Sequence, residues 1–433
     1  MKVTIVGGGA YSWTPELVRD FAVHGGFAGA QVCLMDIAAE PLALAEKLCR
    51  KIVAAAGADL TISTTLDRDE ALAGADVVLV CINTGASRAH GHDTAIPLRY
   101  GIRSAVGDTA GPSGVSRALR NIPVVTGIAR DVRRLCPRAW LINVTNPMTT
   151  LTRAMGLEHR RTVGYCHEVQ WLRLRAAMMY GLPRFTDVEA RIVGINHMTW
   201  VTALKIGDNP DGLAAMRDLA DRQGGLTDPN DGHKPTPVVK ELYDLYGALP
   251  TSLDAHIADF YAPYAVPEMA DRYGLEQYTG AMEERNVRQR NRQRAEGMLS
   301  GALPLNLEHS MEDISHMVHA LRGGGRFLGA ANVPNVGQVD NLPRGAVLES
   351  TALFDWDGVT PLAVGPLRPL LAGVLQNHIV SQELTVEAGL KGDRRLAIEA
   401  MMALPMIRDF AAVPRMVDEL LEANREYLPQ FFG

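Results

Sequence analysis

Two short stretches carry side chains that could hold a metal ion. Cys166 follows the run Thr162-Val163-Gly164-Tyr165, and His197 follows Gly194-Ile195-Asn196. Runs of this kind predict short strands, and a strand delivers the residue after its end to the rim of a cleft. A thiolate and an imidazole together suit a divalent transition metal. A buried structural cysteine and a core histidine are the alternative, and either residue alone would favour it.

A glycine-rich turn near the N-terminus could bind a dinucleotide. Gly7-Gly8-Gly9 follows the β-branched run of residues 2–6, and Thr14-Pro15-Glu16 has the residue types that begin a helix. A strand, a glycine turn and a helix N-terminus bring backbone amides close to a pyrophosphate. Ser12 replaces the usual third glycine of this motif, and a tight turn without a ligand is the alternative.

An acid at the end of the next predicted strand supports nucleotide binding. Asp36 closes the run 31–35, where a carboxylate accepts both hydroxyls of an NAD ribose and repels the additional phosphate of NADP. The apolar run 75–82 ends at Asn83 and Thr84 and is typical of a parallel strand buried on both faces. Because strands and helices alternate here, the sequence predicts a Rossmann-type doubly wound parallel sheet of the lactate/malate dehydrogenase kind. The predicted NAD site consists of Gly7, Gly8, Gly9, Ser12, Asp36, Asn83 and Thr84.

Two polar segments follow in the same half of the chain. Residues 84–120 are rich in Gly, Pro and polar side chains, which predicts a long functional loop, with a plain surface excursion as the alternative. Asn143 and Asn146 stand at the carboxyl end of a predicted strand that stops at Pro147. Their amides could bind a hydroxylated substrate and a nicotinamide, although Asn-Pro also begins ordinary turns.

Length and charge limit the class of protein. A chain of 433 residues predicts two domains, and loss of the strand-helix alternation near 165–205 divides them into an NAD-binding domain, 1–195, and an α+β domain, 196–433, for substrate, metal and oligomerisation. The net charge of −6 argues against nucleic-acid binding, and the apolar runs are too short to span a bilayer. Five scattered cysteines and an N-terminus without a signal peptide predict a cytoplasmic protein.

The second half of the chain is less regular. Residues 208–235 are rich in Gly, Asp and Pro and predict a mobile surface segment, whereas 254–264 concentrates acids, a histidine and tyrosines. A charged helix at 281–299 is predicted to face solvent or another subunit. His316 and His319 share one face of a predicted helix and are interpreted as structural.

The ordered set of motifs resembles glycoside hydrolase family 4, an NAD-dependent exception among glycosidases. The resemblance runs nearly end to end and is far more specific than any one motif. It rests on Gly7-Gly8-Gly9, Gly107-Asp108-Thr109, Asn143-Val144-Thr145-Asn146-Pro147, Cys166-His167, Gly194-Ile195-Asn196-His197 and, in the tail, Gly392-Asp393-Arg394.

The resemblance implies hydrolysis through a transient oxidation. Members of the family use bound NAD⁺ to take hydride from C3 of the sugar, which acidifies C2. A base removes the C2 proton, the aglycone leaves from C1, water adds and the hydride returns, so NAD⁺ is not consumed. A divalent ion, typically Mn²⁺, holds the C2 and C3 oxygens and stabilises the enolate.

The resemblance also implies roles for particular residues. Cys166 and His197 match the metal ligands of the family. Asn146, together with Asn143, matches positions that contact the sugar or the nicotinamide.

For proton transfer the resemblance leaves a choice. Asp254 lies at about the spacing from the metal histidine of the catalytic acidic residue in α-glycosidase members. Tyr264 is the alternative, because phospho-sugar members use a tyrosine as the base at C2. His167 stands where some members carry an acid for the leaving group, and histidine can donate a proton near neutral pH.

The residue after Cys166 points to one branch of the family. The 6-phospho-glycosidases resemble this chain but carry Asp or Asn there, whereas Cys166-His167-Glu168 looks more like members that act on unphosphorylated α-galactosides, α-glucosides or hexuronides. Arg88, Arg99 or Arg285 could bind a carboxylate, which leaves an α-glucuronidase or α-galacturonidase open. A homodimer or homotetramer is expected from the family.

Two other classes of protein share parts of this pattern. A lactate/malate-type 2-hydroxyacid dehydrogenase has the same nucleotide-binding core and an Asn-Pro after a strand, but it needs a His–Asp pair and no Cys–His metal site. A non-catalytic NAD-binding protein would bind the cofactor and hydrolyse nothing. The interpretation that accounts for all the motifs is an enzyme that binds a small glycoside substrate, NAD⁺ and a divalent metal.

Overall fold

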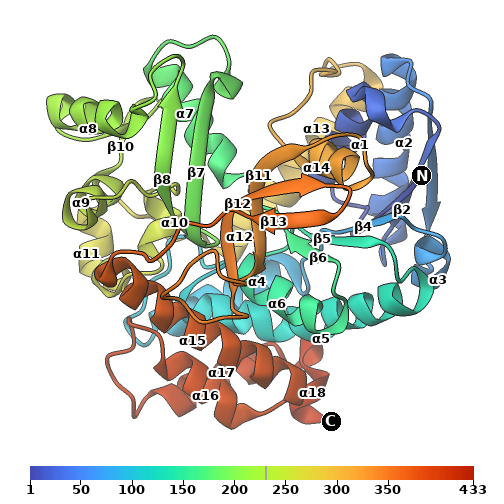
Figure 1. Ribbon diagram of the computed structural model, residues 1–433. Helices are drawn as coiled ribbons and strands as arrows, with labels where there is room; N and C mark the ends of the chain where they lie inside the picture. Colours follow the sequence, from blue (N-terminus) through green and yellow to red (C-terminus); the bar gives the residue numbers. More distant parts are fainter. Residues whose placement is uncertain (230–231) are drawn as a thin grey trace.

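The computed structural model describes residues 1–229 and 232–433 and is organised around one large mixed sheet (Figure 1). The strands of this sheet are β1 (Lys2–Val6), β2 (Ala30–Met35), β3 (Leu60–Thr65), β4 (Val77–Val80), β5 (Trp140–Asn143), β6 (Thr162–Gly164), β7 (Val188–Ile195), β8 (Met198–Ile206), β11 (Phe327–Pro334), β12 (Val347–Asp355) and β13 (Gly358–Pro361). Their order is β3-β2-β1-β4-β5-β6-β11-β12-β7-β8, with β13 paired to β12.

The first six strands are parallel, in the order 3-2-1-4-5-6 of a dinucleotide-binding fold. This confirms the predicted Rossmann-type half. Strand β4 shows why the sequence could predict it. Val77 and Leu79 enter one hydrophobic core, while Val78 and Val80 enter the core on the opposite face. A continuous apolar run is what a strand covered on both faces requires.

Helices cover both faces of the parallel half. Leu17 and Phe21 of α1 and Met317 of α14 share a core with β1, whereas Ile122 of α5 and Leu151 of α6 share the core on the other face. The helices of the first face are α1 (Trp13–Val23), α2 (Ala39–Ala56) and α14 (Ile314–Leu321), and those of the second are α3 (Arg68–Leu72), α5 (Gly111–Leu135) and α6 (Met148–Glu158).

The second half of the chain extends the same sheet with antiparallel strands. β11 joins β6, β12 joins β11, and the β7–β8 hairpin joins β12. The hairpin projects at the side of the molecule opposite the N-terminus and carries its own helices (Figure 1). These are α7 (Glu168–Met179), α8 (Gly212–Gln223), α9 (Pro237–Tyr246), α10 (Asp254–Ala258) and α11 (Pro267–Arg272). The predicted domain division between residues 195 and 196 falls in the hairpin turn and stays a prediction.

A long helical segment and a C-terminal helix group complete the fold. The helical segment is α12 (Gly280–Glu283), a π-helical stretch (Glu284–Gln289) and α13 (Arg290–Ser300). The C-terminal helices, drawn in red in Figure 1, are α15 (Pro369–Lys391), α16 (Arg394–Met402), α17 (Val413–Ala423) and α18 (Pro429–Phe432). They pack on α5 and on α4 (Ala86–Leu98) around one shared core. In the described part of the chain, no helix combines the length and the apolar character that crossing a membrane requires.

Two segments are more regular than the sequence predicted. Residues 84–120 contain all of α4 and the start of α5, so the prediction of one long loop was wrong, and residues 99–110 connect the two helices. The buried ion pair between Arg120 and Asp93 (2.5 Å) fixes α5 against α4, and both helices form despite a Gly and Pro content that is unfavourable for a helix. Residues 208–235 contain α8 and the short strands β9 (Thr227–Asp228) and β10 (Lys234–Pro235), and residues 230–231 of that prediction lie outside the described residues.

Candidate active site

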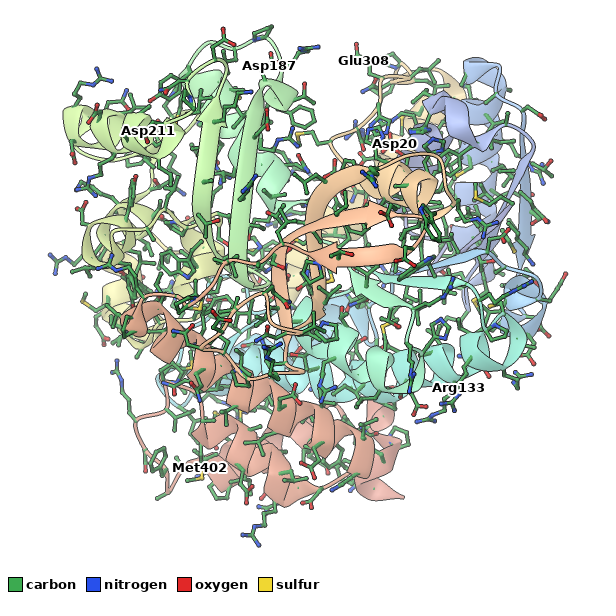
Figure 2. The ribbon with its side chains drawn as sticks, viewed as in Figure 1. Asp20, Arg133, Asp187, Asp211, Glu308 and Met402 are labelled. Carbon is green, nitrogen blue, oxygen red and sulfur yellow. The ribbon has the colours of Figure 1, made fainter. Side chains whose placement is uncertain are left out.

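His197 lies in the tight turn of the β7–β8 hairpin. Ile195 pairs with Met198, so Asn196 and His197 form a two-residue turn, and His197 has a φ of +65°. This conformation is unfavourable for a residue with a Cβ atom, and such residues concentrate at functional sites. Figure 2 shows Asp187 at the outer end of the hairpin, so the turn with His197 lies at the inner end, in the body of the molecule.

Cys166 meets His197 as the sequence predicted. It follows β6 and Tyr165, and its Sγ lies 3.6 Å from Nε2 of His197. Both side chains are buried, with 8% and 5% of their surface exposed. The structure therefore brings the two predicted metal ligands together, although 31 residues separate them.

Two further metal-binding side chains, which the sequence did not assign, lie beside this pair. Ligand atoms of Asp108, His197 and His256 lie within 4.8 Å of one another, and among the described residues this is the one such group of three. Oδ1 of Asp108 is 3.7 Å from Nδ1 of His197, and the His256 ring centroid is 4.4 Å from that of His197. Thr109 Oγ1 also contacts Nδ1, at 3.0 Å. One nitrogen of His197 therefore faces Cys166, and the other faces Asp108 and Thr109.

The protonation of this group suits a divalent cation. Burial lowers the pKa of both His197 and His256, which favours the neutral imidazole that ligates metals. Burial alone would raise the pKa of Asp108, but the pKa is lowered: His197 and His256 contribute when they carry a proton, and the charge of Arg117 and the hydrogen bond from Thr109 contribute in addition. The carboxylate is therefore ionised.

Cys166 has the opposite tendency, because burial and the carboxylates of Glu349 and Glu168 raise the pKa of its thiol. A cation beside the sulfur would offset that effect, since coordination deprotonates a thiol. Asp108, His197 and His256 thus supply an anion and two imidazoles whose ligand atoms lie close together, and Cys166 supplies a soft donor at the other nitrogen of His197. Donors of these types suit a divalent transition metal.

Asn146 and Asn143 have different positions. Asn146 donates from Nδ2 to Oδ2 of Asp108 (2.8 Å), and its buried Oδ1 has no partner among the described residues. It is therefore an acceptor that the described residues leave unsatisfied, and its contact with a substrate stays a prediction. Asn143 is fully buried and bonds Thr145 and Thr152 around the end of β5, so it shapes the turn and offers no group to a substrate.

His167 lies against the start of α1. Its ring stacks on Trp13, with centroids 5.4 Å apart and planes within 8°, and its Nδ1 lies 2.7 Å from Oε1 of Glu312. Burial alone would lower the pKa of His167, but the bond and the charge of Glu312 outweigh it and the pKa is raised. A carboxylate that fixes Nδ1 orients the ring and leaves Nε2 for proton transfer.

The structure places Asp254 and Tyr264 in other surroundings. Asp254 accepts hydrogen bonds from the backbone N–H groups of Val238 and Val239 at 3.1 and 2.9 Å, so both of its oxygens cap α9. Tyr264 stacks edge-on against Tyr273 in an aromatic group beside α9. The predicted catalytic role of these two residues is therefore not supported by their contacts.

The glycine turn after β1 has the geometry of a nucleotide cradle. Gly7 has a φ of +94°, and a Cβ atom there would lie 1.8 Å from the carbonyl oxygen of Cys81. The N–H of Gly9 donates to Oδ2 of Asp36 at 2.9 Å, which sets the predicted ribose ligand next to the turn. Ile37, the next residue, exposes 91% of its side chain and offers an apolar surface to an adenine. Ser12 precedes α1 at its N-cap position, without a side-chain capping bond.

The residues after β4 lie beside the glycine turn and are held by distant residues. Asn83 donates from Nδ2 to Oε1 of Glu283 (2.7 Å), and its buried Oδ1 lacks a partner among the described residues. The backbone of Thr84 is held by Asn121 and Arg120 of α5. All seven predicted cofactor residues thus lie on the turns that follow β1, β2 and β4, and their contact with NAD stays a prediction.

The three arginines suggested for a carboxylate do not meet at the site. Arg88 pairs with Glu426 (2.9 Å) and Arg99 pairs with Glu419 (2.8 Å), both near the C-terminal helices. Arg285 is exposed on the π-helical stretch.

Comparison with known proteins identifies the family. The model of the family 4 glycosyl hydrolases matches residues 2–181, and the model of their C-terminal domain matches residues 192–407. The chain belongs to family 4 of the glycosyl hydrolases. It is 30% identical to an α-galactosidase and 29% identical to an α-galacturonidase, both of Bacillus subtilis strain 168. These matches cover 99% and 98% of this chain and 99% and 97% of the two relatives.

Solved structures agree with the family 4 fold. A 6-phospho-α-glucosidase from gut microorganisms, solved with NAD and Mn²⁺, has a TM-score of 0.86 at 21% identity, over 99% of both chains. Malate dehydrogenase from Plasmodium falciparum has a TM-score of 0.53 at 13% identity, over 92% of this chain and 99% of its own, which shows the shared dinucleotide-binding architecture. As a family 4 member the protein is a glycoside hydrolase, and the dehydrogenase and non-catalytic alternatives are set aside.

Proposed function

We propose that the protein hydrolyses an unphosphorylated α-hexoside or α-hexuronide with the help of NAD⁺ and a divalent cation, with Mn²⁺ as the preferred ion. One observation carries the proposal. The metal-binding group of Asp108, Cys166, His197 and His256 lies with Asn146 at the carboxyl edge of the sheet that also presents the glycine turn. Ligands of open α/β sheets bind at this edge.

The glycine turn and the end of β2 would hold the cofactor. Gly7 and Gly8 let the turn pack against Cys81 and Leu34 and so shape the turn that would face the pyrophosphate. Asp36 would accept the ribose hydroxyls, and the exposed Ile37 would pack on the adenine. NAD⁺ supplies a hydride acceptor that returns the hydride later in the cycle. The NAD-bound 6-phospho-α-glucosidase of the same fold supports this assignment.

The buried metal group would orient the sugar. His197 would hold the cation, together with Cys166 on its Nε2 side or with Asp108 and His256 on its Nδ1 side. The charge of the cation would stabilise the anion that forms when the C2 proton is lost. Asn146 is fixed by Asp108 and directs its free Oδ1 to a substrate hydroxyl. Its amide thereby couples the position of the sugar to the position of the metal ligands.

His167 would transfer the proton of the leaving group. Glu312 holds Nδ1, and Trp13 supports the ring from one side. Nε2 is then the nitrogen that can protonate the departing glycosidic oxygen and later take a proton from water. The carboxylate makes the imidazolium easier to form and so keeps a proton available near neutral pH.

Two lines of support favour an unphosphorylated substrate. Relatives named α-galacturonidase and α-galactosidase are 29% and 30% identical to the chain, and a probable 6-phospho-β-glucosidase is 28% identical, so the second line carries more weight. The residue after Cys166 is histidine, which resembles the branch that acts on unphosphorylated sugars.

Localisation and assembly are further parts of the proposal. We assign the enzyme to the cytoplasm, because its five cysteines are unpaired. We also propose that it forms a homodimer or homotetramer, which light scattering on the purified chain would test.

The deciding experiment is hydrolysis of p-nitrophenyl α- and β-hexosides, hexuronides and 6-phosphohexosides, with and without NAD⁺, Mn²⁺ and a thiol reductant. The proposal requires release of nitrophenol from an unphosphorylated α-substrate that depends on both additions and accumulates no NADH. A primary isotope effect with substrate deuterated at C2 or C3 would support the redox route. Activity on 6-phosphohexosides alone would overturn the substrate assignment.

A further inference from the structure

A substrate carboxylate needs a cation with free N–H groups close to the metal site. Arginine is the suitable residue, because its planar fork donates two parallel hydrogen bonds to a carboxylate. The arginines suggested by the sequence are engaged elsewhere or exposed, as Arg88 and Arg99 show. The structure offers another arginine at the site itself.

Arg117 of α5 lies against the backbone of Asn146, in the turn that follows β5. It is 9% exposed, and its Nε donates to the backbone oxygen of Asn146 at 3.3 Å. Within residues 1–229 and 232–433 this is the one hydrogen bond of its side chain, and its two terminal nitrogens form no ion pair. They are also absent from the buried, unbonded side-chain atoms, so both remain open to solvent. A nearly buried guanidinium with two open donors is unusual, because buried charges are normally paired.

Arg120, one turn further along α5, provides the contrast. Its Nη1 lies 2.5 Å from Asp93 and its Nε donates to the backbone oxygen of Thr84, while its Nη2 is buried without a partner among the described residues. This guanidinium is therefore enclosed by the protein. The two arginines share a helix and differ in their partners. Arg120 fastens α5 to α4, whereas Arg117 keeps its terminal donors available.

Asn146 links Arg117 to the metal-binding group. The backbone of Asn146 accepts from Arg117, its Nδ2 donates to Asp108, and its Oδ1 is free. Arg117 is also close enough for its charge to favour the ionised form of Asp108. Two donors and one acceptor therefore lie together beside the metal ligands, where a bound cation would compensate the charge of Asp108.

We infer that Arg117 is the specificity residue that binds the carboxylate of a hexuronide, so that the substrate is an α-hexuronide rather than a neutral α-hexoside. The inference rests on the proposed function. Nη1 and Nη2 of Arg117 donate to the two carboxylate oxygens, and the Oδ1 of Asn146 accepts from a neighbouring hydroxyl. The carboxylate replaces the water that otherwise solvates the two terminal nitrogens.

The test compares Arg117→Met and Arg117→Lys with wild type on p-nitrophenyl α-galacturonide, α-glucuronide and the matching neutral hexosides. We expect kcat/KM on the preferred uronide to fall at least 100-fold in Arg117→Met, mainly through KM. The loss on the neutral sugar should be at least tenfold smaller, because only the bond to Asn146 and the charge near Asp108 are lost there. Arg117→Lys keeps the charge without the fork and should lie between the two. Arg99→Met, which removes an arginine already paired with Glu419, is the control.

A binding measurement keeps the test independent of turnover and of the folding of one variant. Saturation-transfer NMR should show that free galacturonate or glucuronate binds wild type and Arg117→Lys, and that the signal is lost in Arg117→Met with an unchanged melting temperature. Equal losses on uronides and neutral sugars, or a wild-type enzyme that prefers neutral hexosides, would overturn the inference. Absence of any hydrolysis that depends on NAD⁺ and Mn²⁺ in wild type would instead remove the proposed function.

Discussion

Asp254 and His256 lie two residues apart in α10 and point to opposite sides of it. Two residues advance an α-helix by about 200°. The carboxylate of Asp254 accordingly caps α9, while the ring of His256 meets His197 with centroids 4.4 Å apart. The two side chains therefore have separate tasks, one in the scaffold and one at the site.

Substitution of the two residues should separate stability from metal binding. Asp254→Ala leaves two N–H groups of α9 uncapped and should cost about 1 kcal/mol of unfolding free energy, with nearly unchanged Mn²⁺ dependence. His256→Ala should raise the Mn²⁺ concentration for half-maximal activity at least about tenfold, because even indirect partners of metal ligands are worth 10- to 100-fold in affinity. Urea unfolding and Mn²⁺ titration measure the two effects. A large loss of activity in folded Asp254→Ala would restore Asp254 to the catalytic residues.

Substitution of Cys166 should weaken Mn²⁺ binding and leave NAD⁺ binding unchanged. Serine preserves the size of the side chain but is a poor ligand for a transition metal, so Cys166→Ser should lose most Mn²⁺-dependent activity at low Mn²⁺ and keep the NAD⁺ affinity of wild type. Calorimetric titrations with NAD⁺ and with Mn²⁺ distinguish the two. Cys136→Ser, in the core on the α5 side of the sheet, is the matched control. Equal Mn²⁺ affinity in Cys166→Ser and wild type would remove Cys166 from the ligands.

The sequence predicts those parts of the fold and site that depend on local patterns. The run 77–80 is apolar because both faces of β4 are covered, and Gly7 is glycine because a Cβ atom would overlap the Cys81 carbonyl. His197 could be predicted because it closes a hairpin with clear alternation.

Other parts depend on contacts that no local pattern encodes. Helix α4 was missed because its stability comes from packing and from the Arg120–Asp93 pair. Asp108 lies 148 positions before His256, so only the folded chain shows that they meet. The composition of segment 254–264 indicates a functional segment, but it does not show which side chain faces the metal group. That depends on how the short helix α10 is rotated, which places His256 at the site and Asp254 at α9. Arg117 carries no motif, and its open donors are visible only in the structure.

Glu283 should contribute to cofactor binding through Asn83. The segment Gly280–Ser300 runs from α4, where Glu284 accepts from Ser87, to α2, where Arg292 pairs with Glu40 at 2.8 Å. It therefore borders the adenosine half of the predicted cleft. A hydrogen bond to a charged group contributes about 1.5–3 kcal/mol and a neutral one about 0.5–1.5 kcal/mol. Glutamine keeps a neutral acceptor for Asn83 and should lose about 1 kcal/mol of the difference, so Glu283→Gln should weaken NAD⁺ binding about three- to tenfold and leave Mn²⁺ affinity unchanged.

Equilibrium dialysis with NAD⁺ measures that effect. Glu296→Gln removes a carboxylate from α13 that pairs only with the exposed Arg292 among the described residues, and it should bind NAD⁺ as wild type does. If Glu283→Gln also keeps the wild-type affinity, the segment is structural and the cleft ends at Asn83.

His378 should make the fold sensitive to acid. It is buried on α15, where its Nε2 donates to the backbone oxygen of Phe260 (2.9 Å), and burial lowers its pKa to about 4. The unfolded chain takes up a proton near pH 6.5 and the folded chain only near pH 4, so stability is full above 6.5 and declines as the pH falls towards 4. This single group should cost about 2–3 kcal/mol of unfolding free energy between pH 7.5 and 4.5.

Urea unfolding at both pH values measures this effect. His378→Gln keeps a donor for Phe260 but does not titrate, so its unfolding free energy should decline less than that of wild type. The exposed control His233→Gln should decline as wild type does. Parallel declines in all three proteins would assign the acid sensitivity to other groups.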